Sequence, residues 1–321
     1  MSRYNRIIIA IVALGLIAAV THAEEGGSGH YMPGSMASFV DGVPAEPAFI
    51  ARLNYLHYSG DTNVDRSIPI AGMTALDVQA ESDGYGLTLL WAPDWDMGSQ
   101  WRYAMSATIP WVTMTVEANV AASPGGSNLT VKRKDRESGL GDIILMPLML
   151  NYKVNEDLNT NFRLAVYAPA GDYEAGRLAN PGKNFWTVEP TAAVMYFGQK
   201  NGIEASLFFG MDFNTENLDT DYQSGIQAHL DGTLAQHFPL WGGLAGAGAS
   251  AFWYQQISDD SGDGATFGGF KARAHGTGPV LSYATKIAGQ DLIAEFKWLH
   301  EFDNQKRLEG DTVFFKVLAK F

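Results

Sequence analysis

The sequence contains no cysteine, which excludes disulfides, thiolate metal sites and cysteine nucleophiles. Basic residues are also scarce, because 22 Lys and Arg are set against 35 Asp and Glu, and this balance argues against a nucleic-acid partner. Charged residues of both signs make up only 18% of the chain, compared with about 25% in typical soluble proteins. The composition therefore suits either a soluble all-β protein or a chain that hides apolar surface in lipid.

Long hydrophobic runs are absent except for one at the N-terminus. A positively charged head with Arg3 and Arg6 precedes an apolar core at 7–20 and a small-residue end at Ala23. This pattern is typical of a secretory signal peptide, and we expect residues 1–23 to be removed. The apolar core is shorter than the roughly 20 residues of a spanning helix, so an uncleaved anchor is the less favoured alternative. A polytopic helical membrane protein is excluded because no second run exists.

From Phe49 onward, apolar side chains alternate with polar or small ones, which is the period of β-strands. No segment of comparable length keeps a helical period. Segments 62–82 and 113–138 either lengthen neighbouring strands or form loops. About twelve strands are predicted, near 48–59, 83–92, 99–112, 139–153, 158–168, 184–198, 201–213, 221–238, 241–256, 267–287, 290–302 and 311–321.

Three features favour a transmembrane barrel over a periplasmic sandwich. The strands are long, aromatic residues such as Trp101 and Trp111 end the apolar faces, and the final strand closes on Phe321. That ending looks like the terminal strand recognised by the outer-membrane assembly machinery. We therefore predict an all-β, antiparallel, up-and-down transmembrane barrel at 48–321, located in the bacterial outer membrane, with lipid and this machinery as partners.

Several sequence motifs carry a resemblance to a known family. They include Gly29–Gly34 (GHYMPG), Asp41–Pro44 (DGVP), Gly139–Asp142 (GLGD) and Asn180–Trp186 (NPGKNFW). The chain resembles, over nearly its whole mature length, the outer-membrane family labelled "MetA-pathway of phenol degradation", which includes the SphA-like proteins. The resemblance implies an outer-membrane β-barrel linked to metabolism of aromatic or other hydrophobic compounds. It implies no catalytic residues.

Residues 24–47 precede the first strand and contain Gly, Pro and Ala without sustained alternation. Two alternatives remain open for this N-terminal segment. It either folds into the lumen as a plug or gate, or it forms a loose periplasmic tail. His30 is accordingly either a gating residue or a packing residue.

The period of two also predicts which side chains face the lumen. Segment 143–150 is apolar on both faces, so Ile144, Met146 and Leu148 point inward if Asp142 is luminal, and Met149 points to lipid. This inward face is either a track for a hydrophobic solute or a packing surface for the N-terminal segment. The predicted solute path comprises Ile144, Met146, Leu148, His30, Arg102, Arg163, His229 and Arg273. Other charged residues predicted to face inward are Arg52, Glu189, Glu204, Asp212, Asp231, His237, Lys271, Glu295, Lys297 and Glu301.

Catalytic and cofactor motifs are not recognisable in the sequence. The acidic loop 258–264 misses the calcium-loop spacing, and the glycine-rich stretch 242–248 lies in a strand with no helix after it. The seven histidines show no metal-ligand spacing, so we predict no catalytic, cofactor or metal residues.

The predicted function is a channel, not an enzyme, for passive uptake of small hydrophobic or aromatic compounds. A structural or adhesive barrel with a closed lumen is the first alternative. An outer-membrane hydrolase is less favoured, because His300 is its one candidate and a histidine at the membrane interface explains that residue more simply.

Overall fold

The computed structural model describes residues 29–62, 68–70, 73–121, 130–265 and 270–321. The predicted signal peptide and residues 24–28 lie outside the described residues. The described chain is almost entirely β-strand, with one short 3-10 helix at Phe39–Asp41. In these residues we find no helix with the length and apolar character needed to cross a membrane.

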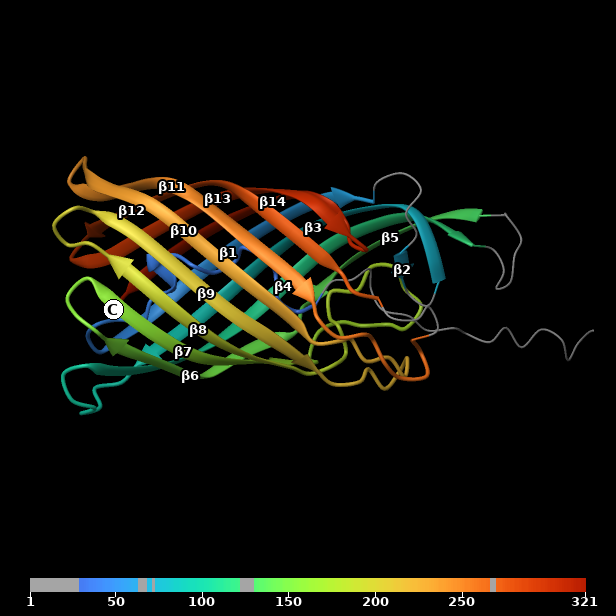
Figure 1. The fold of residues 1–321 in the computed structure, drawn as a ribbon, viewed down its shortest axis with the longest axis horizontal. Coiled ribbons are helices and arrows are strands. Elements are labelled where there is room, and N and C mark those ends of the chain that lie inside the picture. The colour runs from blue at the N-terminus through green and yellow to red at the C-terminus, as the bar shows by residue number, and fades with distance from the viewer. Residues whose placement is uncertain (1–28, 63–67, 71–72, 122–129, 266–269) are drawn as a thin grey trace, which may run out of the picture.

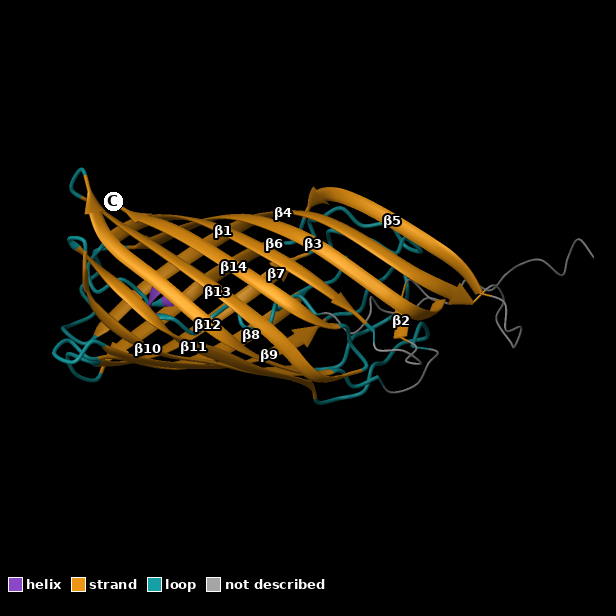
Figure 2. Cartoon of the chain, turned by 90° about the horizontal axis from the view of Figure 1, so that it is seen from above, coloured by secondary structure: helices purple, strands orange, loops and turns teal. Residues whose placement is uncertain are grey.

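Twelve strands of the described chain form a closed antiparallel barrel (Figures 1 and 2). The ring closes where β1 pairs with β14, for example Ile50 with Lys320, and where β3 pairs with β4. The predicted fold class and strand number are therefore confirmed. The ring strands are β1 (Ala48–Asp61), β3 (Met73–Ala92), β4 (Trp101–Ala121), β6 (Ile143–Lys153), β7 (Leu158–Ala168), β8 (Thr187–Phe197), β9 (Ile203–Asn214), β10 (Gln227–Leu240), β11 (Gly243–Gln256), β12 (Arg273–Ile287), β13 (Gln290–Gln305) and β14 (Glu309–Lys320).

In their described parts, the segments 62–82 and 113–138 form strands. A short strand, β2 (Ile68–Ile70), pairs with the start of β3. A longer one, β5 (Thr130–Leu140), pairs with the second half of β4, while β6 pairs with the first half. The break between β5 and β6 at Gly141–Asp142 leaves Asp142 outside the regular ladder, where its carboxylate is available to the lumen.

The two faces of the barrel differ in polarity as the alternation predicts. Large apolar side chains such as Leu53, Ile109 and Leu207 are exposed on the outer face, where lipid would cover them. The lumen is lined by buried charged groups, because charge is costly in lipid. Buried examples from the predicted inward set are Arg163, Glu189, Glu204, Asp212, His229, Asp231, His237, Glu295, Lys297 and Glu301.

Tight turns join strands at one end of the barrel and longer segments join them at the other. Trp241 and Gly242 link β10 to β11 with positive φ angles of 47° and 79°, and Ala288 and Gly289 link β12 to β13 in the same way. The C-terminus lies at this tight-turn end (Figure 1). In outer-membrane barrels short turns face the periplasm, which orients the molecule.

The predicted orientations of Leu148 and Met149 are wrong. The pairing of β6 with β7 shifts between Leu145 and Leu148, a bulge that contains Pro147. Proline has no N–H for the ladder, and one extra residue in a bulge exchanges the two faces of the strand beyond it. Met149 consequently pairs with the inward-facing Arg163 and is only 3% exposed, while Leu148 pairs with the outward-facing side of β7.

Candidate functional site

The N-terminal segment, in its described part 29–47, runs through the lumen from the extracellular half to the start of β1. At its upper end, His30 Nε2 lies 2.8 Å from an Asp142 carboxylate oxygen, and Nδ1 lies 2.6 Å from Thr187 Oγ1. The His30 ring stacks on Tyr167 at 5.0 Å between centroids. Burial acts to raise the pKa of Asp142, but hydrogen bonds from His30 and the Gly171 backbone outweigh it and lower this pKa.

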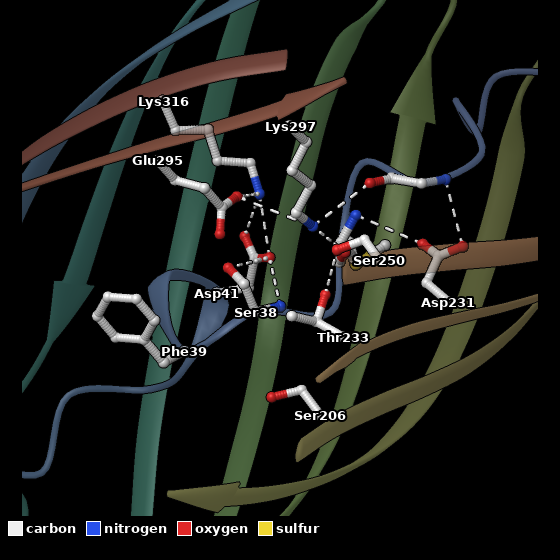
Figure 3. Close-up of polar contacts among 12 residues, drawn as sticks. Ser38, Phe39, Asp41, Ser206, Asp231, Thr233, Ser250, Glu295, Lys297 and Lys316 are labelled. Atoms are coloured by element: carbon white, nitrogen blue, oxygen red, sulfur yellow. Dashed lines mark hydrogen bonds and ion pairs between the residues drawn. The ribbon is translucent and has the colours of Figure 1, made fainter. Parts of the chain in front are cut away.

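The middle of the segment is held by two charged residues of the barrel wall. The Tyr31 hydroxyl donates to Asp231, and the backbone N–H of Gly34 donates to the same carboxylate at 3.2 Å. Lys297 Nζ donates to the carbonyl of Met36 at 2.7 Å (Figure 3). The wall therefore offers an acceptor for backbone N–H groups and a donor for carbonyls, which irregular backbone inside a barrel requires.

The short helix places Asp41 among three cations. Lys316 Nζ lies 2.9 Å from one Asp41 oxygen, and Arg52 Nη1 lies 3.1 Å from the same atom. Arg163 Nη2 donates to the Asp41 carbonyl at 2.9 Å. Burial acts to raise the pKa of Asp41, but the charges of Lys316, Arg52 and Lys297 together hold it well below its usual range. This carboxyl group is therefore ionised and links the segment to β1 and β14, while the backbone carbonyl of Asp41 links it to β7.

These contacts place residues 29–47 inside the barrel. The segment lies against charged and polar side chains of β7–β10 and β13–β14. Its short helix lies inside the ring of strands (Figure 2).

A cavity of about 480 Å³ remains between the segment and the part of the wall that β1, β3, β4, β6 and β14 form. Its surface is mainly apolar. Wall residues that line it include Leu56, Val78, Leu90, Val112, Met114, Val116, Ile144, Met146, Met149, Phe314 and Leu318.

The structure brings four of the predicted path residues to this cavity. Ile144 and Met146 line it from β6, His30 from the segment and Arg163 from β7. Leu148 is not among the lining residues because of the bulge.

The remaining three path residues lie elsewhere. Arg102 borders a smaller cavity of about 250 Å³ near the tight-turn end, and its Nε donates to the Ala45 carbonyl at 2.9 Å. His229 is fully buried beneath Tyr31. Arg273 lies at the start of β12 and pairs with Asp303 at 2.8 Å.

Sequence reasoning missed the importance of Asp41 and Lys316. Lys316 is the single charged side chain between Thr312 and Leu318, and the parity of the final strand turns it inward. That isolated charge was the available signal for a luminal ion pair. Asp41 had no such signal, since it lies in a segment without a regular period.

A potential metal-binding group was also hidden from sequence spacing. Glu189, Asp212 and His229 come from three different strands, yet their ligand atoms lie within 4.8 Å of one another. Because these residues are far apart in the chain, the spacing of the histidines does not reveal them.

The fold and its plugged, partly apolar lumen define an outer-membrane β-barrel. The chain belongs to the family described as "Putative MetA-pathway of phenol degradation", whose model matches residues 59–317. The family resemblance read from the sequence is thus confirmed.

One solved structure shows the same fold, and others match the chain less well. The COG4313 outer membrane channel from Pseudomonas putida F1 is 17% identical, with a TM-score of 0.63, and the match covers 91% of this chain and 100% of that one. The β domain of the Bordetella autotransporter BrkA is 11% identical with a TM-score of 0.46, covering 86% and 98%. A Pseudomonas aeruginosa FadL homologue is 10% identical with a TM-score of 0.39, covering 93% and 98%. A search of the curated proteins gave no match.

Proposed function

We propose that this protein is an outer-membrane channel for passive uptake of small hydrophobic or aromatic compounds. The observation that carries the proposal is the asymmetry of the lumen. The N-terminal segment covers the charged side, and the space that remains is the mainly apolar cavity of about 480 Å³. An apolar cavity with a few polar groups at its edge is suited to binding small apolar molecules.

The comparisons with known proteins also support a channel for small aromatic compounds. The family description refers to phenol degradation, and phenols are small aromatic compounds. The similar structure from Pseudomonas putida is described as an outer membrane channel. We transfer both properties to this chain as part of the proposal.

In the proposed mechanism a solute enters the cavity from the extracellular side and moves past the N-terminal segment. Arg163, Arg52, Lys316 and Asp41 line the inner part of the cavity. These groups form ion pairs and hydrogen bonds with one another. In this mechanism, a local shift of the short helix at Phe39–Asp41 breaks these contacts and opens the route toward the tight-turn end.

The test is uptake of a panel of aromatic compounds by cells with and without the protein, with a small sugar as the hydrophilic control. Faster entry of the aromatic compounds, with unchanged entry of the sugar, is the expected result. Equal aromatic uptake in both strains would favour the closed structural barrel.

A hydrolase finds less support in the site. His300 is exposed on the outer face, and its Nδ1 lies 3.1 Å from an Asp311 oxygen. A Ser–His hydrolase needs a hydrogen bond between the serine hydroxyl and the imidazole. No serine of the described residues forms such a bond with His300.

A further inference from the structure

Three side chains with metal-binding atoms meet on the inner face of β8, β9 and β10. Glu189, Asp212 and His229 each have an exposed fraction of 0%. His229 Nε2 lies 3.4 Å from Glu189 Oε1 and 3.9 Å from Asp212 Oδ1. They lie beneath the N-terminal segment, outside the apolar cavity, and have no role in the uptake proposed above.

The strand register places the two carboxylates opposite each other. Val188 pairs with Phe213 on β9, so the next residues, Glu189 and Asp212, face one another across β8 and β9. Like charges directly opposite on neighbouring strands repel, and burial makes this repulsion more costly. Among the described residues, His229 is the one group that forms ion pairs with these two carboxylates. One imidazole provides at most one positive charge for two negative ones.

Four polar atoms of this group also have no hydrogen-bond partner among the described residues. Both carboxylate oxygens of Asp212 and both ring nitrogens of His229 are buried and have no hydrogen bond. Such groups are rare in folded proteins because each loses its contact with water and gains nothing in return. Glu189, by contrast, is held in place by the Tyr167 hydroxyl at 2.7 Å and the Thr191 hydroxyl at 2.9 Å. Hydroxyls in these positions orient a carboxylate toward a ligand.

We propose that Glu189, Asp212 and His229 bind a divalent transition-metal cation of the Zn²⁺ type. The distances of 3.4 and 3.9 Å from His229 Nε2 to the two carboxylate oxygens are close to the separation of donors around an ion with bonds of about 2.0–2.2 Å. One imidazole and two carboxylates favour such a cation over Ca²⁺ or Mg²⁺, which take oxygen ligands. The cation neutralises the facing carboxylates and supplies a partner to the open atoms of Asp212 and His229.

The cation site is coupled to the N-terminal segment through His229. The Tyr31 ring stacks on the His229 ring at 3.6 Å between centroids, with an angle of 15° between the planes. The Tyr31 hydroxyl is bonded to Asp231 on the same strand. A cation that fixes the His229 ring therefore also fixes the surface on which Tyr31 rests, and it stabilises the plugged lumen.

The experiment measures zinc in the full-length protein. The barrel is refolded into detergent with ZnSO₄, passed through a desalting column with a weak chelator, and analysed by mass spectrometry for metals. We expect wild-type protein to retain one zinc ion per chain and Asp212→Asn to lose it. The substitution keeps the shape of the side chain and removes the like-charge contact, so the barrel is expected to fold. Glu204→Gln is the matched control, because it also removes a buried carboxylate of β9 beside a histidine and should keep the zinc.

A second measurement covers the case in which Asp212→Asn does not fold. His229→Gln removes the nitrogen ligand, and heat-modifiable mobility on a gel reports folding of each variant. Refolding with Co²⁺ should give visible absorption bands in wild type and in Glu204→Gln but not in folded His229→Gln. Zinc absent from wild type, or retained equally by folded Asp212→Asn or His229→Gln, would overturn the proposal. Neither result bears on uptake of aromatic compounds.

Discussion

Lys316 on the last strand holds both carboxylate oxygens of Asp41, at 2.9 and 3.0 Å. This contact joins the two ends of the described chain within the lumen, because Asp41 lies before β1 and β14 closes the barrel against β1. The ion pair therefore stabilises the position of the N-terminal segment as well as the wall behind it.

Replacing Asp41 with Asn should loosen the N-terminal segment without unfolding the barrel. Breaking a buried ion pair costs about 3 kcal/mol, and Glu295, which lies 3.4 Å from Lys316, keeps that lysine from being isolated. We expect a lower urea midpoint and a higher ion conductance in planar bilayers. Glu46→Gln is the control, since that side chain is largely exposed on the same segment and should leave both quantities unchanged. Equal conductance in wild type and Asp41→Asn would rule out this anchor.

The lowered pKa of Asp41 predicts how the plug responds to acid. A carboxyl group whose pKa is lower in the folded state stabilises that state fully above its ordinary pKa of about 3.8. The contribution declines as the pH falls from there toward the lowered pKa of the folded state. Conductance of the wild-type channel should therefore stay low from pH 7 to about 5 and rise below about pH 4. Asp41→Asn should be open throughout. Opening of the wild type between pH 5 and 7 would assign the response to other groups.

The strand pattern was predictable because each strand has a polar and an apolar face in fixed alternation. The strand at 158–168 was predicted with the bounds of β7, and most others lie within a few residues. The bulge at Pro147 was not predicted, since segment 143–150 is apolar on both faces and its pattern does not show where the faces exchange. Alternation reports the face of a residue only while the register is unbroken.

The path of residues 29–47 and the grouping of Glu189, Asp212 and His229 could not be predicted from the sequence. The segment lacks a regular period, so its course depends on the wall side chains it meets, such as Asp231 and Lys297. The three ligand residues meet through the register of three strands, and a periodic pattern contains no information on register between strands.

Deletion of Phe321 should impair assembly more than any loop substitution. Phe321 exchanges backbone hydrogen bonds with Phe49, at 2.8 and 3.3 Å, at the seam between β14 and β1. Its loss removes the last pair of the closing strands and the aromatic end of the predicted assembly signal, and unpaired backbone groups in lipid cost several kcal/mol each. We expect little heat-modifiable, folded protein in outer membranes. Wild-type amounts would show that neither role depends on this residue.

Gly210→Ala should displace His229 and the segment above it. A Cβ atom at position 210 would overlap the imidazole of His229 and come within 3.0 Å of Thr191 Oγ1. Overpacking of this kind costs about 1–3 kcal/mol. We expect a lower urea midpoint and loss of the Tyr31–His229 stacking, seen as reduced quenching of tyrosine fluorescence in a variant without tryptophan. Gly232→Ala, whose Cβ would make only ordinary contacts, is the control and should leave both unchanged.

Met146→Lys separates transport from architecture. Met146 lines the apolar cavity, where a lysine stays hydrated at the edge of the lumen, so the barrel should still fold. Uptake of aromatic compounds should slow, because a charge in a narrow apolar cavity raises the barrier to their entry. Leu145→Lys is the matched control on the neighbouring position, since Leu145 is 42% exposed on the outer face and faces lipid. A lysine there costs about 2–4 kcal/mol near the membrane midplane and should lower the folded yield without a specific effect on uptake per folded barrel. If Met146→Lys folds and transports like wild type, the cavity is not on the solute path, and the closed structural barrel becomes the better interpretation.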